Sequence, residues 1–86
     1  MNSNLENKTV LVTGGAGGIG SYISKAFANE GANVIVHYYN SKEKAEKLAK
    51  EINGTALNCD LTKSDESMSL FNQIVETKGD IDICIA

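Results

Sequence analysis

Five glycines lie within residues 14–20 of this 86-residue chain, directly after the apolar run Val10–Val12 and directly before a helical pattern. A buried strand that ends in a glycine turn and leads into a helix presents free backbone N–H groups at the positive end of the helix dipole. Glycine is needed there because a side chain would hold a pyrophosphate away from the backbone. The segment therefore predicts a turn that binds the phosphates of a nucleotide.

Two glycine spacings overlap in this turn. Residues 15–20 fit Gly-x-Gly-x-x-Gly, the general dinucleotide fingerprint, and residues 13–20 fit the longer pattern Thr-Gly-x-x-x-Gly-Ile-Gly. The alternative without a ligand is a flexible connection between a strand and a helix. A triphosphate-binding Walker A turn is excluded, because Ser21 and not a lysine follows Gly20.

The segment Thr13–Gly20 resembles the cofactor loop of the short-chain dehydrogenase/reductase family, whose members bind NAD(H) or NADP(H). The resemblance continues at Leu5–Lys8, at Asn58–Leu61 and at Gly79–Ile83. It implies an enzyme that transfers a hydride between nicotinamide and a carbonyl or alcohol substrate, with this chain as the cofactor-binding part. It also implies a homo-oligomer, either a dimer or a tetramer, in the intact protein.

The same resemblance assigns cofactor contacts to the ends of four strands. Asp60 matches the family aspartate that accepts a hydrogen bond from the adenine amino group, whereas its residue type alone indicates an Asp that caps a turn. Leu61 would offer its backbone to the ring edge, and Ala86 matches the first residue of the family's Asn-Asn-Ala-Gly turn. The expected contacts are Gly14, Ala16, Gly17, Gly18, Ile19, Gly20, Tyr38, Tyr39, Asn40, Ser41, Cys59, Asp60, Leu61 and Ala86.

The family selects NAD through an acidic residue that closes the second strand and binds the adenosine ribose hydroxyls. Tyr38 occupies that position, and residues 36–42 contain no carboxylate that would repel a 2′-phosphate. The arginine markers of NADP binding are missing as well, and Gly17 stands where a basic residue often does. The chain therefore favours NADP(H) over NAD(H), with the phosphate held by Asn40, Ser41, Lys42 and the N-terminus of the second helix.

No catalytic residue is expected in this chain, because the family's Ser, Tyr and Lys lie in its second half. Tyr38 and Lys42 have the Tyr-x-x-x-Lys spacing, but that spacing aligns two side chains only on a helix, and Tyr38 closes a strand. His37 is interpreted as a strand-end side chain, since it has no Ser, Cys or carboxylate partner nearby in the sequence.

Two other functions remain open. One is a non-catalytic nucleotide-binding sensor of the same fold. The other is a nucleoside-binding methyltransferase, which would also need an acid where Tyr38 lies.

Composition narrows the partners further. The net charge of −3 and the dispersed basic residues give no nucleic-acid or membrane-binding patch, and no 18-residue apolar span occurs. We therefore expect a cytoplasmic protein. Cys59 and Cys84 are expected on the order of 14 Å apart, as buried reduced side chains. A single histidine and two distant thiols predict no metal site.

Hydrophobic patterning predicts alternating strands and helices. This order is typical of an α/β protein with a Rossmann-like, doubly wound parallel sheet in the strand order 3-2-1-4, with a ligand crevice at the carboxyl ends of strands 1 and 4. The expected strands are Thr9–Thr13, Asn33–Tyr38, Thr55–Cys59 and Ile81–Ala86, and the expected helices are Gly18–Asn29, Ser41–Ile52 and Ser64–Lys78.

Each helix carries an apolar stripe that should face the sheet. Met68 is also assigned to the core, Gly31 is expected to end the first helix, and Ser64 is expected to open the third as a cap. The stripes are Ile19, Ile23, Ala26 and Phe27; Ala45, Leu48, Ala49 and Ile52; and Leu70, Phe71, Ile74 and Val75.

The last apolar strand has no turn or polar tail after it. A sheet that ended there would expose a hydrophobic edge, which soluble proteins avoid. We therefore expect residues 1–86 to be the N-terminal part of a single, incomplete Rossmann domain. Alone, this part should aggregate and should show no dehydrogenase turnover.

Overall fold

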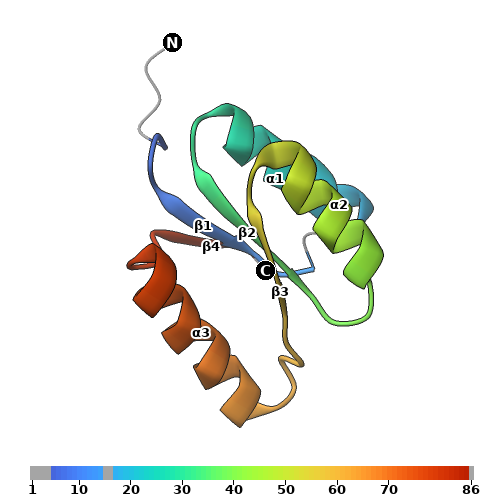
Figure 1. The fold of residues 1–86 in the computed structure, drawn as a ribbon, viewed down its shortest axis with the longest axis vertical. Coiled ribbons are helices and arrows are strands. Elements are labelled where there is room, and N and C mark those ends of the chain that lie inside the picture. The colour runs from blue at the N-terminus through green and yellow to red at the C-terminus, as the bar shows by residue number, and fades with distance from the viewer. Residues whose placement is uncertain (1–4, 15–16, 86) are drawn as a thin grey trace.

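The structure, a computed structural model, describes residues 5–14 and 17–85. Strands and helices alternate along the chain, as Figure 1 shows. No helix in this described part is long and apolar enough to cross a membrane. The elements are β1 (Thr9–Val12), α1 (Gly18–Asn29), β2 (Asn33–Tyr38), α2 (Lys42–Ile52), β3 (Thr55–Asn58), α3 (Ser64–Lys78) and β4 (Ile83–Ile85).

The strands form one parallel sheet in the order β3-β2-β1-β4. Val10 of β1 is paired with Val34 of β2 on one side and with Ile83 of β4 on the other. The chain thus moves outward from β1 to β3 and then crosses back to place β4 beside β1. This arrangement confirms the predicted fold class and strand order. The direction in which successive strands are added reverses between β1 and β4, which we call the reversal point.

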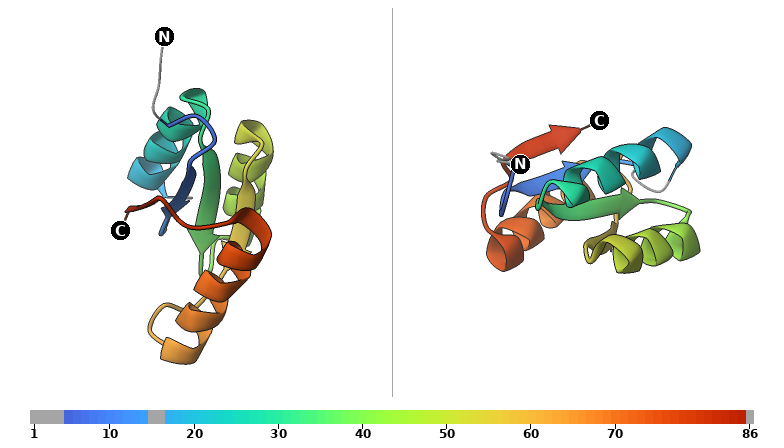
Figure 2. Two further views of the ribbon diagram at one scale, coloured as in Figure 1. Left: turned by 90° about the vertical axis from the view of Figure 1, so that its left-hand side faces the viewer. Right: turned by 90° about the horizontal axis from the view of Figure 1, so that it is seen from above.

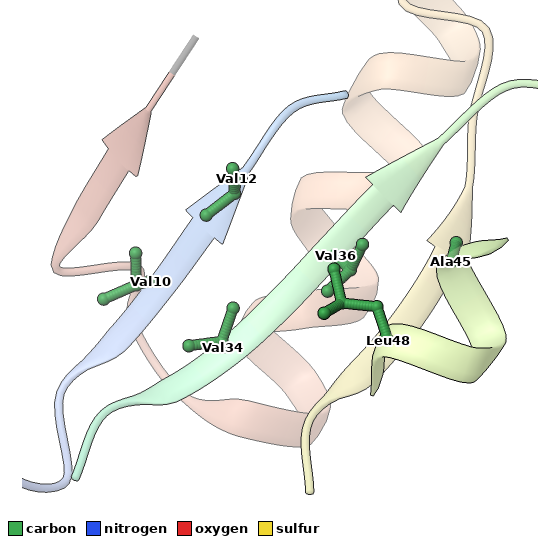
Figure 3. Packing of buried hydrophobic residues seen from close by; sticks show 6 residues of the cluster. All are labelled: Val10, Val12, Val34, Val36, Ala45 and Leu48. Carbon is green, nitrogen blue, oxygen red and sulfur yellow. The ribbon is translucent and has the colours of Figure 1, made fainter. Parts of the chain in front are cut away.

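Helices cover both faces of the sheet, so β1 is buried along its whole length. Side chains alternate between faces along a strand, and Val10 and Val12 pack toward α1 and α2 while Leu11 packs toward α3. Figures 1 and 2 show α1 and α2 side by side, with α3 apart from them. Figure 3 shows the valines of β1 and β2 beside Ala45 and Leu48 of α2.

The first helix buries a different stripe from the predicted one. Ile23 and Phe27 pack against the core as expected, but Ala28 joins them in place of Ala26, which is exposed. Ile19 was also assigned to the core and is 79% exposed, because it lies in the first turn of α1 at the carboxyl edge of the sheet. The apolar periodicity predicted the bounds of this helix correctly, but it predicted only part of the face that packs against the core.

The third helix contacts the sheet along a narrower line than predicted. Leu70 and Ile74 are buried, one helical turn apart, whereas Phe71 and Val75 are exposed on the flank of the helix. Met68, which was assigned to the core, is 65% exposed. The reason is that no described element lies against this flank of α3.

The second helix buries Ala45, Leu48 and Ala49 as predicted, with Ile52 half-buried at its end. Gly31 follows α1 with a φ of +86°, a conformation that favours glycine, so the predicted end of the first helix is confirmed.

Two local predictions, the cap of the third helix and the burial of Cys84, are wrong. The residue before α3 is Lys63, so Ser64 is the first helical residue and does not cap the helix with its side chain. Both cysteines are free, and Cys59 is buried as expected, but Cys84 is exposed. Its neighbours Ile83 and Ile85 face α1 and α2, so Cys84 faces the opposite side, where α3 does not reach this outer strand.

Candidate functional site

The loops that follow β1, β2 and β3 all lie at the carboxyl edge of the sheet, because the strands are parallel. This edge collects most of the residues that the sequence assigned to a cofactor. They are Gly14, Gly17, Gly18, Ile19 and Gly20 after β1; Tyr38, Tyr39, Asn40 and Ser41 at the end of β2; and Cys59, Asp60 and Leu61 after β3. Ala16 and Ala86 lie outside the described residues.

The glycine turn passes directly into α1. The Gly17 N–H donates to the Gly14 carbonyl at 3.2 Å, and the first helical bond runs from the Ser21 N–H to the Gly17 carbonyl at 2.6 Å. Residues 18–20 therefore lie before the first hydrogen-bonded amide of the helix, and their N–H groups have no partner within it. These donors, at the positive end of the α1 dipole, suit an anion.

Gly14 and Gly18 differ in what the structure demands of them. Gly14 has a φ of +63°, which strains any residue with a Cβ. At Gly18 the φ is ordinary and an added Cβ would meet no heavy atom within 4 Å. Neither packing nor backbone conformation within the described residues demands glycine at position 18. The open space in front of it is what a ligand that contacts the backbone would need.

Thr13 joins the glycine turn to the end of β4. Its N–H donates to the Ile85 carbonyl at 2.9 Å, and its hydroxyl donates to the same oxygen at 3.1 Å. Thr13 is in a turn and was predicted as the last residue of the strand. These bonds hold the carboxyl ends of β1 and β4 together, at the point where a doubly wound sheet binds its ligand.

The loop after β2 leads into the N-terminus of α2. Tyr38 is half-buried at the end of β2, and residues 39–41 are exposed. A surface hollow of about 460 Å³ is lined by residues 40–44, which include the ammonium groups of Lys42 and Lys44 and the carboxylate of Glu43. Tyr38 ends a strand and Lys42 begins a helix, which confirms that their spacing is not the catalytic helical pair.

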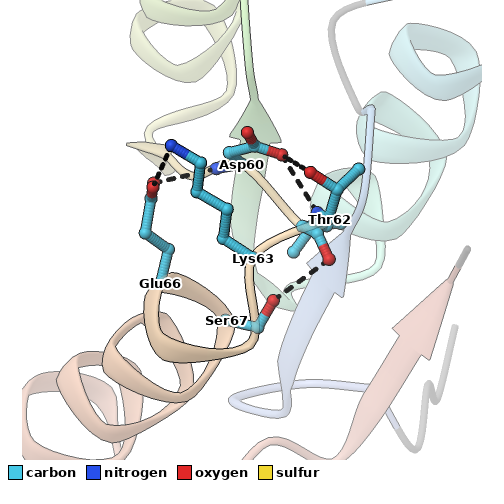
Figure 4. A network of polar contacts seen from close by, with 6 residues as sticks. Asp60, Thr62, Lys63, Glu66 and Ser67 are labelled. Atoms are coloured by element: carbon cyan, nitrogen blue, oxygen red, sulfur yellow. Dashed lines mark hydrogen bonds and ion pairs between the residues drawn. The ribbon is translucent and has the colours of Figure 1, made fainter.

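Asp60 begins a tight turn after β3 (Figure 4). Its Oδ1 accepts hydrogen bonds from the Thr62 N–H at 3.0 Å and from the Thr62 hydroxyl at 2.6 Å, and its own N–H donates to Glu66 at 3.2 Å. The Thr62 hydroxyl, followed by the Thr62 amide, lowers the pKa of the Asp60 carboxyl. Asp60 thus caps the turn with one oxygen, and its carboxylate is held in place.

Cys59 contributes its backbone to this edge. Its side chain is 2% exposed, and burial raises the pKa of the thiol, with smaller contributions from the charges of Glu66 and Asp60. Its N–H donates to the Tyr38 carbonyl at 3.0 Å, which ties the loop after β3 to the end of β2. Leu61 is 42% exposed and available to a ligand.

His37 is a residue of this edge that sequence reasoning missed. Its imidazole is 5% exposed and lies between the glycine turn and the loop after β3. The Gly14 N–H donates to Nδ1 at 3.1 Å, and Nε2 lies 2.8 Å from the Cys59 carbonyl. Both partners are backbone atoms, which no side-chain spacing reveals. The available signal was the strand alternation, which places His37 on the buried face of Ile35.

The described residues contain no cluster of His, Cys, Asp or Glu side chains arranged to hold a metal ion. What the edge offers is a set of backbone donors at the start of α1, a hollow with two ammonium groups at the start of α2, and a fixed carboxylate after β3. An elongated ligand with phosphates near β1 and a polar ring near β3 fits this set of groups.

Comparison with known proteins points to the same kind of ligand. A protein-family model described as short chain dehydrogenase matches residues 8–86. A short-chain dehydrogenase/reductase of Pestalotiopsis microspora is 40% identical over 84 residues, which cover 92% of this chain and 32% of the relative. The 3-oxoacyl-acyl-carrier-protein reductase FabG of Staphylococcus epidermidis is 37% identical over 84 residues, covering 92% of this chain and 34% of the enzyme.

Among solved structures, a short chain dehydrogenase from Bacillus anthracis superimposes with a TM-score of 0.85 at 33% identity, covering 93% of this chain and 35% of that one. The chain spans about a third of the length of the relatives that it matches. The match over residues 8–86 and the shared sheet topology lead to one conclusion. The chain belongs to the short-chain dehydrogenase family.

Proposed function

We propose that residues 1–86 form the N-terminal dinucleotide-binding part of an NAD(P)-dependent short-chain oxidoreductase. The observation that carries this proposal is the start of α1, where the N–H groups of residues 18–20 have no partner within the helix and a Cβ at Gly18 would meet open space, at the reversal of strand order between β1 and β4. When bound, the nicotinamide supplies the hydride chemistry. The part played by these residues is to bind the diphosphate and to orient the dinucleotide.

The adenosine end of the cofactor is assigned to the loops after β2 and β3. Asp60 accepts a hydrogen bond from the adenine amino group, while Cys59 and Leu61 line the ring. This assignment is supported by the fixed carboxylate, whose Oδ1 already serves Thr62, so the adenine amino group would use Oδ2. Ala16, Ile19 and Ala86 complete the proposed cofactor contacts.

The cofactor is proposed to be NADP(H). Residues 36–42 contain no carboxylate that would repel a 2′-phosphate. The hollow at residues 40–44 offers the exposed side chains of Asn40 and Ser41 and the N-terminus of α2, and its lining holds two lysines against the single carboxylate of Glu43. Tyr38 and Tyr39 would flank the ribose. The lysines and the helix N-terminus around this hollow therefore favour NADP(H), with its 2′-phosphate, over NAD(H).

The intact protein is proposed to reduce a carbonyl group or to oxidise an alcohol, in the cytoplasm and as a homo-oligomer. The reductase names of the relatives support the reaction class, and the two free cysteines suit a reducing compartment. We propose that the family's catalytic Ser, Tyr and Lys lie outside these residues, so that this chain binds the cofactor and leaves proton transfer to the remainder. We propose no nucleic-acid or membrane partner.

The test is a fluorescence titration of the full-length protein with NADPH. Gly18→Val is expected to weaken NADPH binding at least about tenfold, because the added side chain occupies the space in front of the N–H groups. Ala26→Val, at an exposed position of the same helix, is the matched control and should leave the affinity unchanged. NADPH should also bind more tightly than NADH.

Two results would count against the proposal. Equal NADPH affinity of the Gly18→Val variant and the unaltered protein would refute the proposal that the glycine turn after β1 binds the phosphates. Tighter binding of NADH than of NADPH would refute the assignment of the 2′-phosphate to residues 40–44 and leave the turn itself in place.

A further inference from the structure

We propose that His37 is a positioning residue. Through its two ring nitrogens it holds the glycine turn after β1 (residues 14–20, the phosphate turn) and the loop after β3 (residues 59–61, the adenine loop) at a fixed separation. This inference rests on the proposed dinucleotide site, since it concerns the two loops that bind the ends of that ligand. The carrying observation is the imidazole between the Gly14 N–H and the Cys59 carbonyl.

The hydrogen bonds define the protonation of the ring. The Gly14 amide can only donate, so Nδ1 must carry a lone pair, and the proton of the neutral ring must be on Nε2. That proton points to the Cys59 carbonyl, 2.8 Å away, which can only accept. The neutral Nε2–H tautomer satisfies both partners, and the reversed tautomer satisfies neither.

Gly14 and Cys59, the two residues that His37 contacts, each make a second hydrogen bond through their other backbone group. The carbonyl of Gly14 accepts the Gly17 N–H at 3.2 Å, so the peptide groups on either side of the left-handed Gly14 are both held. The N–H of Cys59 donates to Tyr38, and the next residue is Asp60. His37 thus links the start of the phosphate turn to the residue just before the proposed adenine carboxylate.

A purely apolar side chain at position 37 would not replace this link. A leucine could fill the space beside Ile35 and Cys59, which belong to the core on this face. It would leave the buried Cys59 carbonyl without its partner, which is costly, and it would release the Gly14 N–H in the exposed glycine turn. The turn would then lose the contact that orients it before the cofactor binds.

Two substitutions separate positioning from packing in the full-length protein. His37→Leu removes both hydrogen bonds and is expected to weaken NADPH binding about tenfold. His37→Asn keeps an acceptor near the Nδ1 position for the Gly14 N–H but is too short to reach the Cys59 carbonyl, so its NADPH affinity is expected to lie between those of the Leu variant and the unaltered protein. Ile35→Val, buried on the same face, is the control: it lowers stability and leaves both hydrogen bonds and the NADPH affinity unchanged.

Nuclear magnetic resonance of the unaltered, nitrogen-15-labelled protein tests the link even if a variant fails to fold. We expect imidazole nitrogen shifts of the Nε2–H tautomer and a scalar coupling between the Gly14 amide nitrogen and His37 Nδ1. The coupling appears only if the Gly14 N–H donates to Nδ1 in solution, so it tests the first half of the link. An Nδ1–H tautomer would overturn the proposal.

The binding results separate this inference from the proposed function. Normal NADPH binding by the His37→Leu variant, or binding by the His37→Asn variant equal to that of the unaltered protein, overturns the role of His37 as a link between the two loops and leaves the proposed function standing. If the unaltered protein binds no dinucleotide, the proposed function fails and this inference fails with it.

Discussion

Asp60 lies where the chain leaves β3, and its Oδ1 accepts both the amide and the hydroxyl hydrogen of Thr62. These bonds favour the ionised carboxylate, so the pKa of Asp60 is lowered. A carboxylate that stays ionised and immobile is a ready acceptor for the amino group of adenine. The Asp60 side chain therefore binds Thr62 within the turn and, in the proposed complex, also binds the adenine amino group.

Substitution of Thr62 by valine should raise the pKa of Asp60 back toward its ordinary value, because the hydroxyl is the largest cause of the shift. A lowered folded-state pKa means that the stabilisation is present above the unfolded pKa and is lost as pH falls through the folded pKa. Carbon-13 titration of the Asp60 carboxyl in the full-length protein measures the shift.

Thr77→Val is the control for this titration, since the Thr77 hydroxyl bonds to the Gln73 carbonyl within α3, away from Asp60. It should leave the Asp60 titration unchanged. An Asp60 pKa that does not rise in the Thr62→Val protein would show that the hydroxyl does not stabilise the carboxylate.

Residue types and spacing predicted much of the site. The glycines could be picked out because phosphate turns restrict which residues fit there, whereas Asp60 was assigned to the cofactor by the family resemblance and by its type alone indicated a turn cap. The role of His37 could not be found, because its partners are the backbone atoms of Gly14 and Cys59, brought together only by the pairing of three strands.

At the scale of elements, the sequence predicted each strand and helix to within two residues at most ends. Apolar periodicity locates a helix well, but its buried face depends on the elements that pack against it. For this reason four residues that the periodicity assigned to the core are exposed. They are Ile19 and Ala26 of α1 and Phe71 and Val75 of α3. Periodicity within one helix carries no information about a missing or distant neighbour.

The connection between α2 and β3 depends on Gly54. A Cβ at this residue would lie 2.5 Å from the Val34 carbonyl of β2, and a backbone atom cannot move aside as a side chain can. Gly54→Ala should therefore lower the free energy of unfolding of the full-length protein by about 1–3 kcal/mol. Denaturant unfolding, followed by circular dichroism, measures this loss.

Gly18→Ala is the matched glycine substitution, because its added Cβ meets no heavy atom within 4 Å. Its stability should stay within about 0.5 kcal/mol of the unaltered protein. Equal stability of the two variants would contradict the close approach of β2 to Gly54.

At the scale of the whole molecule, the parallel sheet brings residues from three loops to one edge. The strand order follows from the alternation of elements and from right-handed crossovers, so it could be predicted before the structure was known. The same architecture leaves large apolar side chains exposed in the described part of the chain. They are Ile19, Tyr22, Tyr39, Leu61, Met68, Phe71 and Val75.

These exposed side chains predict association of the 86-residue chain when it is produced alone. Phe71→Glu should reduce its light scattering at a given concentration, because it removes apolar surface from the α3 flank, where Phe71 is 41% exposed. Gln73→Glu adds the same charge to the same helix without removing apolar surface, so it should have a smaller effect. A monomeric chain that melts cooperatively would contradict this expectation.

The phosphate turn is tested most directly by a crystal structure of the full-length protein with bound NADPH. The diphosphate oxygens should lie within about 3.2 Å of the backbone nitrogens of residues 18–20, at the start of α1. A dinucleotide bound elsewhere, with no ligand atom against that turn, would contradict the central claim.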